Sequence, residues 1–430
     1  MKRPIVVGIM FSAACVIPNP GSAVTIPAGP AVPYPFVLPN GQRPSANFDE
    51  FHIGESSNGR MLTVYGISSQ PYKFLSLRKT VAGTRSRTIY TQKWLASRRA
   101  QVANAASGPG IADNGNAVFG LELLGRDGFA RPTGGVWIKR RSQSLPSQLS
   151  RTGQSPDISA NGRYAVAFGP SPSNGNPKCL TLMRINIATR VASRGCVRGV
   201  ADVDETSLFR VPRGDYPRFN QPRASISADG RFSLVWSDAT NIVAETRGKP
   251  RAYRLFRYDW ATASAQLVAS DATMLAAMRR NPFISRLPST IDELDAAGVW
   301  YKHTANMDTV YLQVGQSYVV RREMAAADAE EILWSPEGTT TSWIGVHPSA
   351  SGSMVMFEDI GTISGLNRCW IATMTKGSVI PSSYTQCPMS PARDGLWSLA
   401  RSGKWIYFIG QVAGSGPYAK RLFVSRRVVP

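Results

Sequence analysis

The three histidines of this 430-residue chain, His52, His303 and His347, are its best candidates for metal chemistry. Neutral imidazole is a common ligand of transition metals, so three such side chains brought together could bind one ion. No other catalytic motif accompanies them: the sequence has no G-x-S-x-G elbow, no Walker loop, no GxGxxG and no HExxH. Because no motif fixes a ligand set, we expect no metal and no other cofactor.

Acidic residues cluster at 202–205, 292–295, 328–331 and 358–359. A glycosidase needs two carboxylates from different elements, held at a fixed separation, and clustering along the chain does not supply that arrangement. Solvated loops and helix caps account for such clusters more simply. We therefore predict no catalytic residue.

Basic residues are the strongest global signal. The chain has 49 Lys and Arg against 28 Asp and Glu, for a formal net charge of +21. Doublets of arginine recur along the whole sequence, and the guanidinium fork suits carboxylate, sulfate or phosphate. Gathered on one face of a fold, they would attract a polyanion; an arginine-rich composition without any partner is the alternative. The candidate binding residues are Arg140, Arg141, Arg279, Arg280, Arg321 and Arg322.

The first 23 residues have the layout of a secretory signal peptide. Lys2 and Arg3 form a basic start, residues 4–17 are uncharged and mostly apolar, and Gly21 and Ala23 are the small residues of a cleavage site. The apolar run is shorter than the roughly 20 residues of a permanent membrane span, and no other span is predicted.

Export determines the expected localisation of the protein and the class of partner that it can meet. We expect one mature domain over 24–430 with a formal charge of +19, because cleavage removes two basic residues. It would be periplasmic or secreted, and a lipoprotein acylated at Cys15 is the alternative. Nucleic acid is excluded as a partner, because an exported protein does not meet it and aromatic residues do not interleave with the basic ones.

Four cysteines remain in the mature chain, and an even number in an exported protein suggests disulfides. Cys179 and Cys196 bracket two β-like runs around a short turn, and Cys369 and Cys387 do the same. These spacings predict two hairpins, each joined at its open end by a disulfide that contributes about 3 kcal/mol. A zinc site is the alternative, but no CxxC supports it.

An internal repeat indicates the strands and turns that position the candidate functional residues. Each copy has Ser or Ala, any residue, then Asn, Asp or Ser, then Gly, and leads into an apolar run that closes on an aromatic residue. Asn-Gly and Asp-Gly supply the positive φ values of tight hairpin turns, and the following residues suit strands. In a degenerate seventh copy Met307 replaces the glycine. The copies begin at Ser56, Ala112, Ser159, Ser227, Thr304, Ser349 and Ala400.

Successive copies are 45 to 77 residues apart. A period near this length, with strands and no long helices, is the signature of a β-propeller blade. We therefore predict an all-β fold: one closed propeller with seven blades, six or eight being alternatives. The two disulfide-bonded hairpins would form the outer strands of two blades. An N-terminal strand at 36–38 or 48–53 would complete the last blade. A helical insertion is predicted near 270–300, with Asp271 as the N-cap of its first helix.

The repeat resembles the TolB-like, or WD40-like Ser-Pro-Asp-Gly, propeller unit over about residues 50–430, although no copy keeps the proline. The resemblance implies a monomeric binding scaffold for an envelope or extracellular protein or an acidic glycan. Oligogalacturonate lyases are exported propellers that use channel histidines for a metal. Similarity to them implies the alternative function, a lyase or hydrolase of acidic polysaccharide.

Overall fold

The computed structural model describes residues 32–33, 48–58, 61–68, 74–79, 87–90, 92–103, 110–124, 130–131, 134–169, 179–204, 224–279, 299–314, 318–326, 330–333, 344–360, 367–374, 383–386, 397–399, 401–403, 405–411 and 420–426. The strands described there form seven antiparallel sheets, which we number 1 to 7 in chain order. The predicted all-β class is confirmed.

Six of the sheets contain four strands each. Sheet 1 consists of β2 (Phe48–Glu55), β3 (Met61–Ser68), β4 (Phe74–Lys79) and β5 (Arg87–Thr88). Sheet 3 consists of β12 (Gln154–Ile158), β13 (Tyr164–Phe168), β14 (Leu182–Asn186) and β15 (Ala192–Arg194). Sheet 4 consists of β16 (Ser225–Ile226), β17 (Phe232–Ser237), β18 (Arg254–Asp259) and β19 (Ser264–Leu267).

The second half of the chain repeats this pattern. Sheet 5 consists of β20 (Val299–His303), β21 (Thr309–Val314), β22 (Tyr318–Glu323) and β23 (Glu330–Leu333). Sheet 6 consists of β24 (Ile344–Pro348), β25 (Met354–Ile360), β26 (Asn367–Thr373) and β27 (Ser383–Gln386). Sheet 7 consists of β28 (Trp397–Leu399), β29 (Trp405–Gln411), β30 (Lys420–Arg426) and β1 (Val32–Pro33).

Sheet 2 has six strands because β8 is long enough to pair with several partners. On one side its two halves pair with β6 and β7, and on the other with β9 and β10. The strands are β6 (Ala100–Ala103), β7 (Gly110–Ile111), β8 (Ala117–Leu124), β9 (Ala130–Arg131), β10 (Val136–Lys139) and β11 (Ser147–Ser150).

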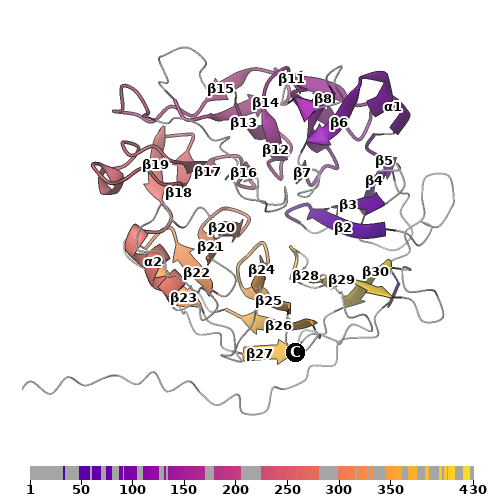
Figure 1. Ribbon diagram of the computed structural model, residues 1–430. Helices are drawn as coiled ribbons and strands as arrows, with labels where there is room; N and C mark the ends of the chain where they lie inside the picture. Colours follow the sequence, from indigo (N-terminus) through magenta and orange to yellow (C-terminus); the bar gives the residue numbers. More distant parts are fainter. Residues whose placement is uncertain are drawn as a thin grey trace, which may run out of the picture.

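The sheets are arranged around a common centre, as in a β-propeller (Figure 1). The first strand of each sheet lies nearest the centre, with β7 in that place in sheet 2 (Figure 1). Neighbouring sheets cover each other's faces, so strands such as β13 and β17 are buried almost continuously rather than on alternate residues. This burial on both faces explains the apolar runs that follow each repeat turn.

Each copy of the predicted repeat lies between the innermost strand of a sheet and the strand that follows it in the chain. The N–H of the fourth residue donates to the carbonyl of the first, as from Gly162 to Ser159 at 2.9 Å. The fourth residue has a positive φ of 58° to 84° in every copy where it is described. These residues are Gly115, Gly162, Gly230, Met307, Gly352 and Gly403. Met307 therefore takes the place of glycine, as predicted.

The third residue of the turn does not take a positive φ, which contradicts the prediction for Asn161 and Asp229. Their side-chain oxygens instead accept an N–H two residues on, from Arg163 and Arg231 at 2.9 Å. Asx side chains favour turns in this way without left-handed backbone. The serine that begins the turn caps it, because Ser227 Oγ accepts the Phe232 N–H at 2.8 Å.

The seven turns also bond to one another, and we call them the turn ring. Each donates an N–H to the next in chain order: Asp113 to the Ala160 carbonyl at 2.9 Å, Ala228 to Ala305 at 2.7 Å, and Ala305 to Ala350 at 2.8 Å. Two further links in the same direction run from Asn161 to Ala228 and from Ala350 to Arg401.

Two carboxylates complete the turn ring at the first turn. The Arg401 N–H donates to a carboxylate oxygen of Glu55, which joins the seventh turn to the first sheet. The Asn58 N–H donates to Asp113 Oδ1 at 3.0 Å and joins the first turn to the second. Described residues of all seven turns are thus linked.

An N-terminal strand completes sheet 7, as predicted, but its position was predicted wrongly. Val32 and Pro33 of β1 pair with Val424 and Phe423 of β30. The expected segment 48–53 instead belongs to β2, the inner strand of sheet 1, and 36–38 lies outside the described residues.

Two α-helices connect sheets. The helix α2 (Asp271–Arg279) confirms the first half of the predicted insertion, and 280–298 lies outside the described residues. Its N-cap is Ser270, whose Oγ accepts the Thr273 N–H at 3.1 Å, and not Asp271 as predicted. The helix α1 (Gln92–Ser97) was not predicted. A short 3-10 helix η3 (Ala244–Thr246) follows β17.

One predicted disulfide is present. Cys179 and Cys196 are bonded across the open end of the hairpin β14–β15, the outer two strands of sheet 3. Cys369 lies in β26 and Cys387 lies outside the described residues, so the second disulfide stays a prediction. In the hairpin β26–β27 Trp370 is opposite Gln386. Continuing that register by one residue would set position 387 opposite Cys369.

We predict that peptide mapping without reduction will recover a Cys369–Cys387 cross-link beside Cys179–Cys196. A paired Ser substitution at Cys369 and Cys387 should then lower the free energy of unfolding by about 3 kcal/mol. The matched control is the same paired substitution at Cys179 and Cys196, with a loss of similar size. Free thiols at both positions in the oxidised protein would contradict the pairing.

Candidate binding surface

The three histidines lie on strands that are first in their sheets. His52 is in β2, His303 in β20 and His347 in β24. The His303 and His347 side chains are half-buried, and that of His52 lies outside the described side chains. His303 Nδ1 is 2.8 Å from the Thr304 carbonyl, so this nitrogen carries the proton and donates to it. Among the described residues no group of three His, Cys, Asp or Glu side chains is placed to hold a metal ion.

Arg401 belongs to the seventh turn of the turn ring. Its guanidinium Nη1 donates to the His303 carbonyl at 2.9 Å, which ties sheet 7 to sheet 5. Burial lowers the pKa of the Arg401 guanidinium, while the nearby carboxylates of Glu55, Asp157 and Asp113 act against that shift. The side chain thus holds one positive charge among carboxylates from sheets 1, 3 and 2.

The predicted arginine doublets do not gather on one face. Arg321 and Arg322 lie inside sheet 5 with 4% and 5% of their surfaces exposed. Their assignment to an exposed binding surface is therefore wrong. Arg279 ends α2 without a described side chain, and Arg280 lies outside the described residues.

Arg140 and Arg141 follow β10, and the first is half-buried while the second is exposed. Of the predicted set, these two alone lie at the surface among the described side chains.

Many other arginines hold the sheets together. The Arg184 guanidinium lies 4.5 Å from the Tyr164 ring centre and 4.7 Å from that of Trp260, and donates to the Gly230 carbonyl at 3.0 Å. Arg257 of sheet 4 donates from Nη1 to the carbonyl of Met307, in the turn of sheet 5, at 3.2 Å. Stacked and bonded guanidinium groups of this kind contribute packing between sheets.

Positive charge is concentrated in the segment 87–200, which includes sheets 2 and 3. Residues 87–200 hold 16 Lys and Arg against 4 Asp and Glu, a net +12 of the +21 in about a quarter of the chain. Eight exposed residues there, which we call the basic surface, pair with no described carboxylate. They are Lys93, Arg98, Arg99, Arg151, Arg163, Arg190, Arg194 and Arg198.

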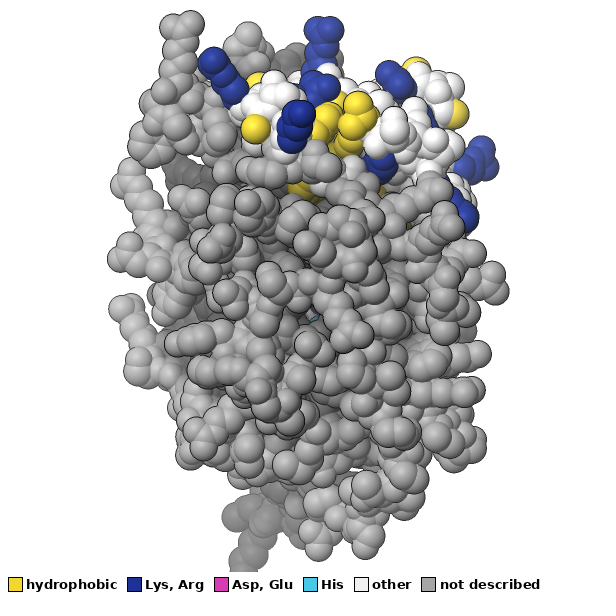
Figure 2. Space-filling model, turned by 90° about the vertical axis from the view of Figure 1, so that its right-hand side faces the viewer, with side chains coloured by type: hydrophobic (Ala, Val, Ile, Leu, Met, Phe, Trp, Pro, Cys, Tyr) yellow, Lys and Arg dark blue, Asp and Glu magenta, His cyan; other side chains and the backbone are white. Residues whose placement is uncertain are grey.

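Figure 2 shows Lys and Arg side chains projecting around an apolar patch at the upper end of the molecule, the end that holds α1, β6 and β8 in Figure 1. Arg98 is fixed there, with its guanidinium 4.9 Å from the Trp94 ring centre and 4.6 Å from that of Trp137. Leu145 and Val191, which belong to the same two sheets, are 59% and 62% exposed. Charge and apolar area of this kind are typical of a binding surface.

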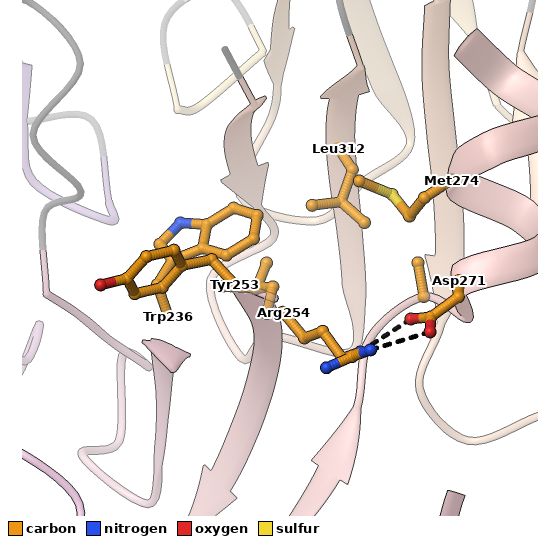
Figure 3. A pocket seen from close by; sticks show the side chains of 8 residues that line it. Trp236, Tyr253, Arg254, Asp271, Met274 and Leu312 are labelled. Carbon is orange, nitrogen blue, oxygen red and sulfur yellow. Dashed lines mark hydrogen bonds and ion pairs between the residues drawn. The ribbon is translucent and has the colours of Figure 1, made fainter. Parts of the chain in front are cut away.

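A small cavity of about 10 Å³ lies between sheet 4 and α2, with room for about one water molecule. Trp236 and Tyr253 line one side of it, and Arg254 faces Asp271 on the other (Figure 3). Arg254 Nε and Nη2 donate to the two carboxylate oxygens of Asp271 at 2.7 and 2.8 Å. This bidentate pair attaches the first residue of α2 to β18 and leaves no space for a ligand.

The Arg254 pair predicts an acid-sensitive contact. Hydrogen bonds from Arg254 hold the pKa of the Asp271 carboxyl below its usual value. Because the pKa is lower in the folded state than in the unfolded state, the stabilisation is present above about pH 4 and is lost as the pH falls through the folded pKa.

Asp271→Asn should therefore lower the free energy of unfolding by about 2 kcal/mol at pH 7 and by less at pH 3. Denaturant unfolding at both pH values measures this difference. The control is Asp202→Asn at an exposed carboxylate, with a change under about 0.5 kcal/mol. An Asp271→Asn effect that does not shrink in acid would contradict the assignment.

The described part of the first acidic cluster has a structural role. Asp204 accepts the Thr240 N–H at 2.7 Å and the Thr240 hydroxyl at 2.6 Å, so it fastens the segment after the disulfide to the loop that follows β17. It is thus accounted for by loop anchoring, as the sequence suggested.

Within the described part of the chain, no helix is both long and apolar enough to cross a bilayer. No protein-family model and no curated protein matches the sequence.

Several solved structures are similar in fold. A prolyl endopeptidase matches with a TM-score of 0.49 and 11% identity over 88% of this chain and 50% of its own, so this chain spans half the length of that protein. The β-propeller domain of Cps50 (Swd1) from Myceliophteria thermophila matches at 0.43 and 10% identity over 89% of this chain and 99% of its own. A chain of the mitotic checkpoint complex matches at 0.46 and 10% identity, with both chains covered completely.

These similarities are too distant to transfer a function. The fold assignment therefore rests on the four-stranded antiparallel sheets, their arrangement around a centre and the turn ring.

Proposed function

We propose that this protein is an exported, TolB-like propeller of seven blades that acts as a binding scaffold for an acidic partner. The basic surface on sheets 2 and 3 carries this proposal. Eight exposed cations without a described carboxylate partner, in a segment of net charge +12, raise the local concentration of anions. The turn ring and the strand β1 support a single closed ring of blades.

Binding of the purified protein to acidic polymers tests the proposal. We expect it to bind polygalacturonate or heparin but not neutral dextran, and to release the acidic polymer as salt screens the exposed charges. Arg151→Gln/Arg198→Gln should weaken binding by about 5-fold or more, because each exposed contact contributes up to about 1 kcal/mol.

The matched control removes two exposed charges outside the basic surface. Arg247→Gln/Lys302→Gln should change the affinity by less than about 2-fold, since both residues are exposed and lie outside sheets 2 and 3, Arg247 after η3 and Lys302 in β20. Equal weakening by the two double variants, or no binding by the unchanged protein, would overturn the proposal. Release of shorter products from polygalacturonate by the same samples would instead support a lyase or hydrolase.

A further inference from the structure

A pocket of about 300 Å³ opens where sheet 2 meets sheet 3, and we call it the arginine pocket. It lies within the surface that carries the basic residues, but only one of those eight residues lines it. The lining residues are Arg140, Gly162, Arg163, Asn186, Ile187 and Ala188.

Hydrogen bonds to neighbouring residues hold parts of the arginine pocket in place. Arg140 reaches over from sheet 2 and donates from Nη2 to the Ile187 carbonyl at 3.1 Å and from Nη1 to Ser147 Oγ at 3.4 Å. Arg163 is fixed through its backbone, because its carbonyl accepts the Ile187 N–H at 2.9 Å. The Arg140 guanidinium and the Arg163 backbone are therefore positioned before any ligand arrives.

Asn186 adds a third donor with a defined direction. Its Oδ1 accepts the N–H groups of Ala188 at 3.0 Å and Thr189 at 3.2 Å, which orients the side-chain amide. The amide nitrogen keeps both hydrogens, and no described group accepts them. The Arg163 guanidinium contacts the Tyr164 ring at 5.8 Å and bonds to no described acceptor.

The chemistry of this lining selects an anion. Two guanidinium groups and an amide donate hydrogen bonds, while no carboxylate lines the pocket. A volume of about 300 Å³ is at the lower end of small-ligand pockets and exceeds what a single oxyanion fills. Ile187 and Ala188 supply an apolar wall beside the donors. These features fit a compact ring that carries one anionic group and several hydroxyls.

We propose that the arginine pocket binds one anionic sugar unit, a uronate or a sulfated hexose, of an acidic glycan chain. This inference rests on the proposed function and assigns the point at which the glycan is recognised. The exposed cations around the pocket attract the rest of the chain, whereas Arg140, Arg163 and Asn186 bind a single unit.

The test compares Arg163→Gln with Arg194→Gln in the otherwise unchanged protein. Both remove one exposed charge from the basic surface, but only Arg163 lines the pocket. Titration with a uronate oligomer and with a sulfated oligosaccharide of equal length should show a 10- to 100-fold weaker affinity for Arg163→Gln, as for loss of charge-assisted hydrogen bonds. Arg194→Gln should weaken the affinity by less than about 3-fold.

The outcomes separate this inference from the proposed function. Equal weakening by Arg163→Gln and Arg194→Gln would overturn the pocket and leave the basic surface in place, whereas no binding of either oligosaccharide by the unchanged protein would overturn both. Tighter binding of a poly-aspartate peptide than of both oligosaccharides would also reject the sugar site. Asn186→Leu serves as a charge-neutral second variant, and a loss of affinity for it with an unchanged melting temperature supports the pocket.

Discussion

Arg401→Met should lower the free energy of unfolding by about 2 to 3 kcal/mol, the largest effect that we expect from a single polar side chain. The guanidinium bonds to the His303 carbonyl and lies among the carboxylates of Glu55, Asp157 and Asp113. All four side chains are half-buried, so removing the guanidinium leaves three carboxylates close together without the positive charge that offsets their repulsion. Methionine keeps the approximate length of the side chain, so the charge is the main change.

Denaturant unfolding with the disulfides intact measures this effect. The control is Arg163→Gln, which removes an exposed guanidinium and should cost less than about 0.5 kcal/mol. A loss under 1 kcal/mol for Arg401→Met would show that Arg401 does not hold the centre of the molecule together.

Gly135→Ala should cost about 3 kcal/mol or more. Gly135 has φ +75°, and a Cβ there would lie 2.2 Å from the Ser150 carbonyl oxygen, a backbone atom of the neighbouring strand β11. The collision cannot be relieved by a side-chain rotation, so β10 and β11 would have to separate. The cost of a left-handed conformation, about 1 to 2 kcal/mol for a non-glycine residue, adds to that.

Gly199→Ala is the matched control, because Gly199 has φ +81° and no atom within 4 Å of the added Cβ. It should cost only about 1 to 2 kcal/mol for the backbone conformation. The difference in the free energy of unfolding between the two variants therefore measures the collision alone. Equal losses would show that the strands can give way at Gly135.

The strand that follows each repeat turn could be predicted because it follows a local signal. The turn motif fixes where this strand begins, and the apolar runs after the copies at Ser159 and Ser227 form β13 and β17. The motif even survives the loss of its glycine at Met307, because the surrounding residues keep the turn.

The parts that escaped prediction depend on contacts between distant segments. An arginine doublet looks the same in sequence whether it is exposed, as at Arg141, or buried inside a sheet, as at Arg321 and Arg322. The strand β1 is only two residues long and has no pattern of its own, because pairing with β30 alone defines it. The excess of positive charge over residues 87–200, in contrast, is a property of the sequence alone. It belongs to the whole segment, so no single arginine doublet indicates it.

The proline missing from the repeat also has a structural explanation. The second residue of the turn donates its backbone N–H to the next turn at Asp113, Ala228, Ala305, Ala350 and Arg401. Proline has no N–H to donate, so at these positions it would break a link of the turn ring.

The links of the turn ring all run in the same direction around the centre, each N–H donating to the turn that follows. Peptide dipoles that follow one another around a circle cancel, whereas those of a helix add along its axis and give its ends a partial charge. The backbone therefore creates no net electrostatic potential along the central axis comparable to that of a helix terminus. The electrostatic potential at the turn ring is therefore set by a few side chains, chiefly Arg401 and the acids around it.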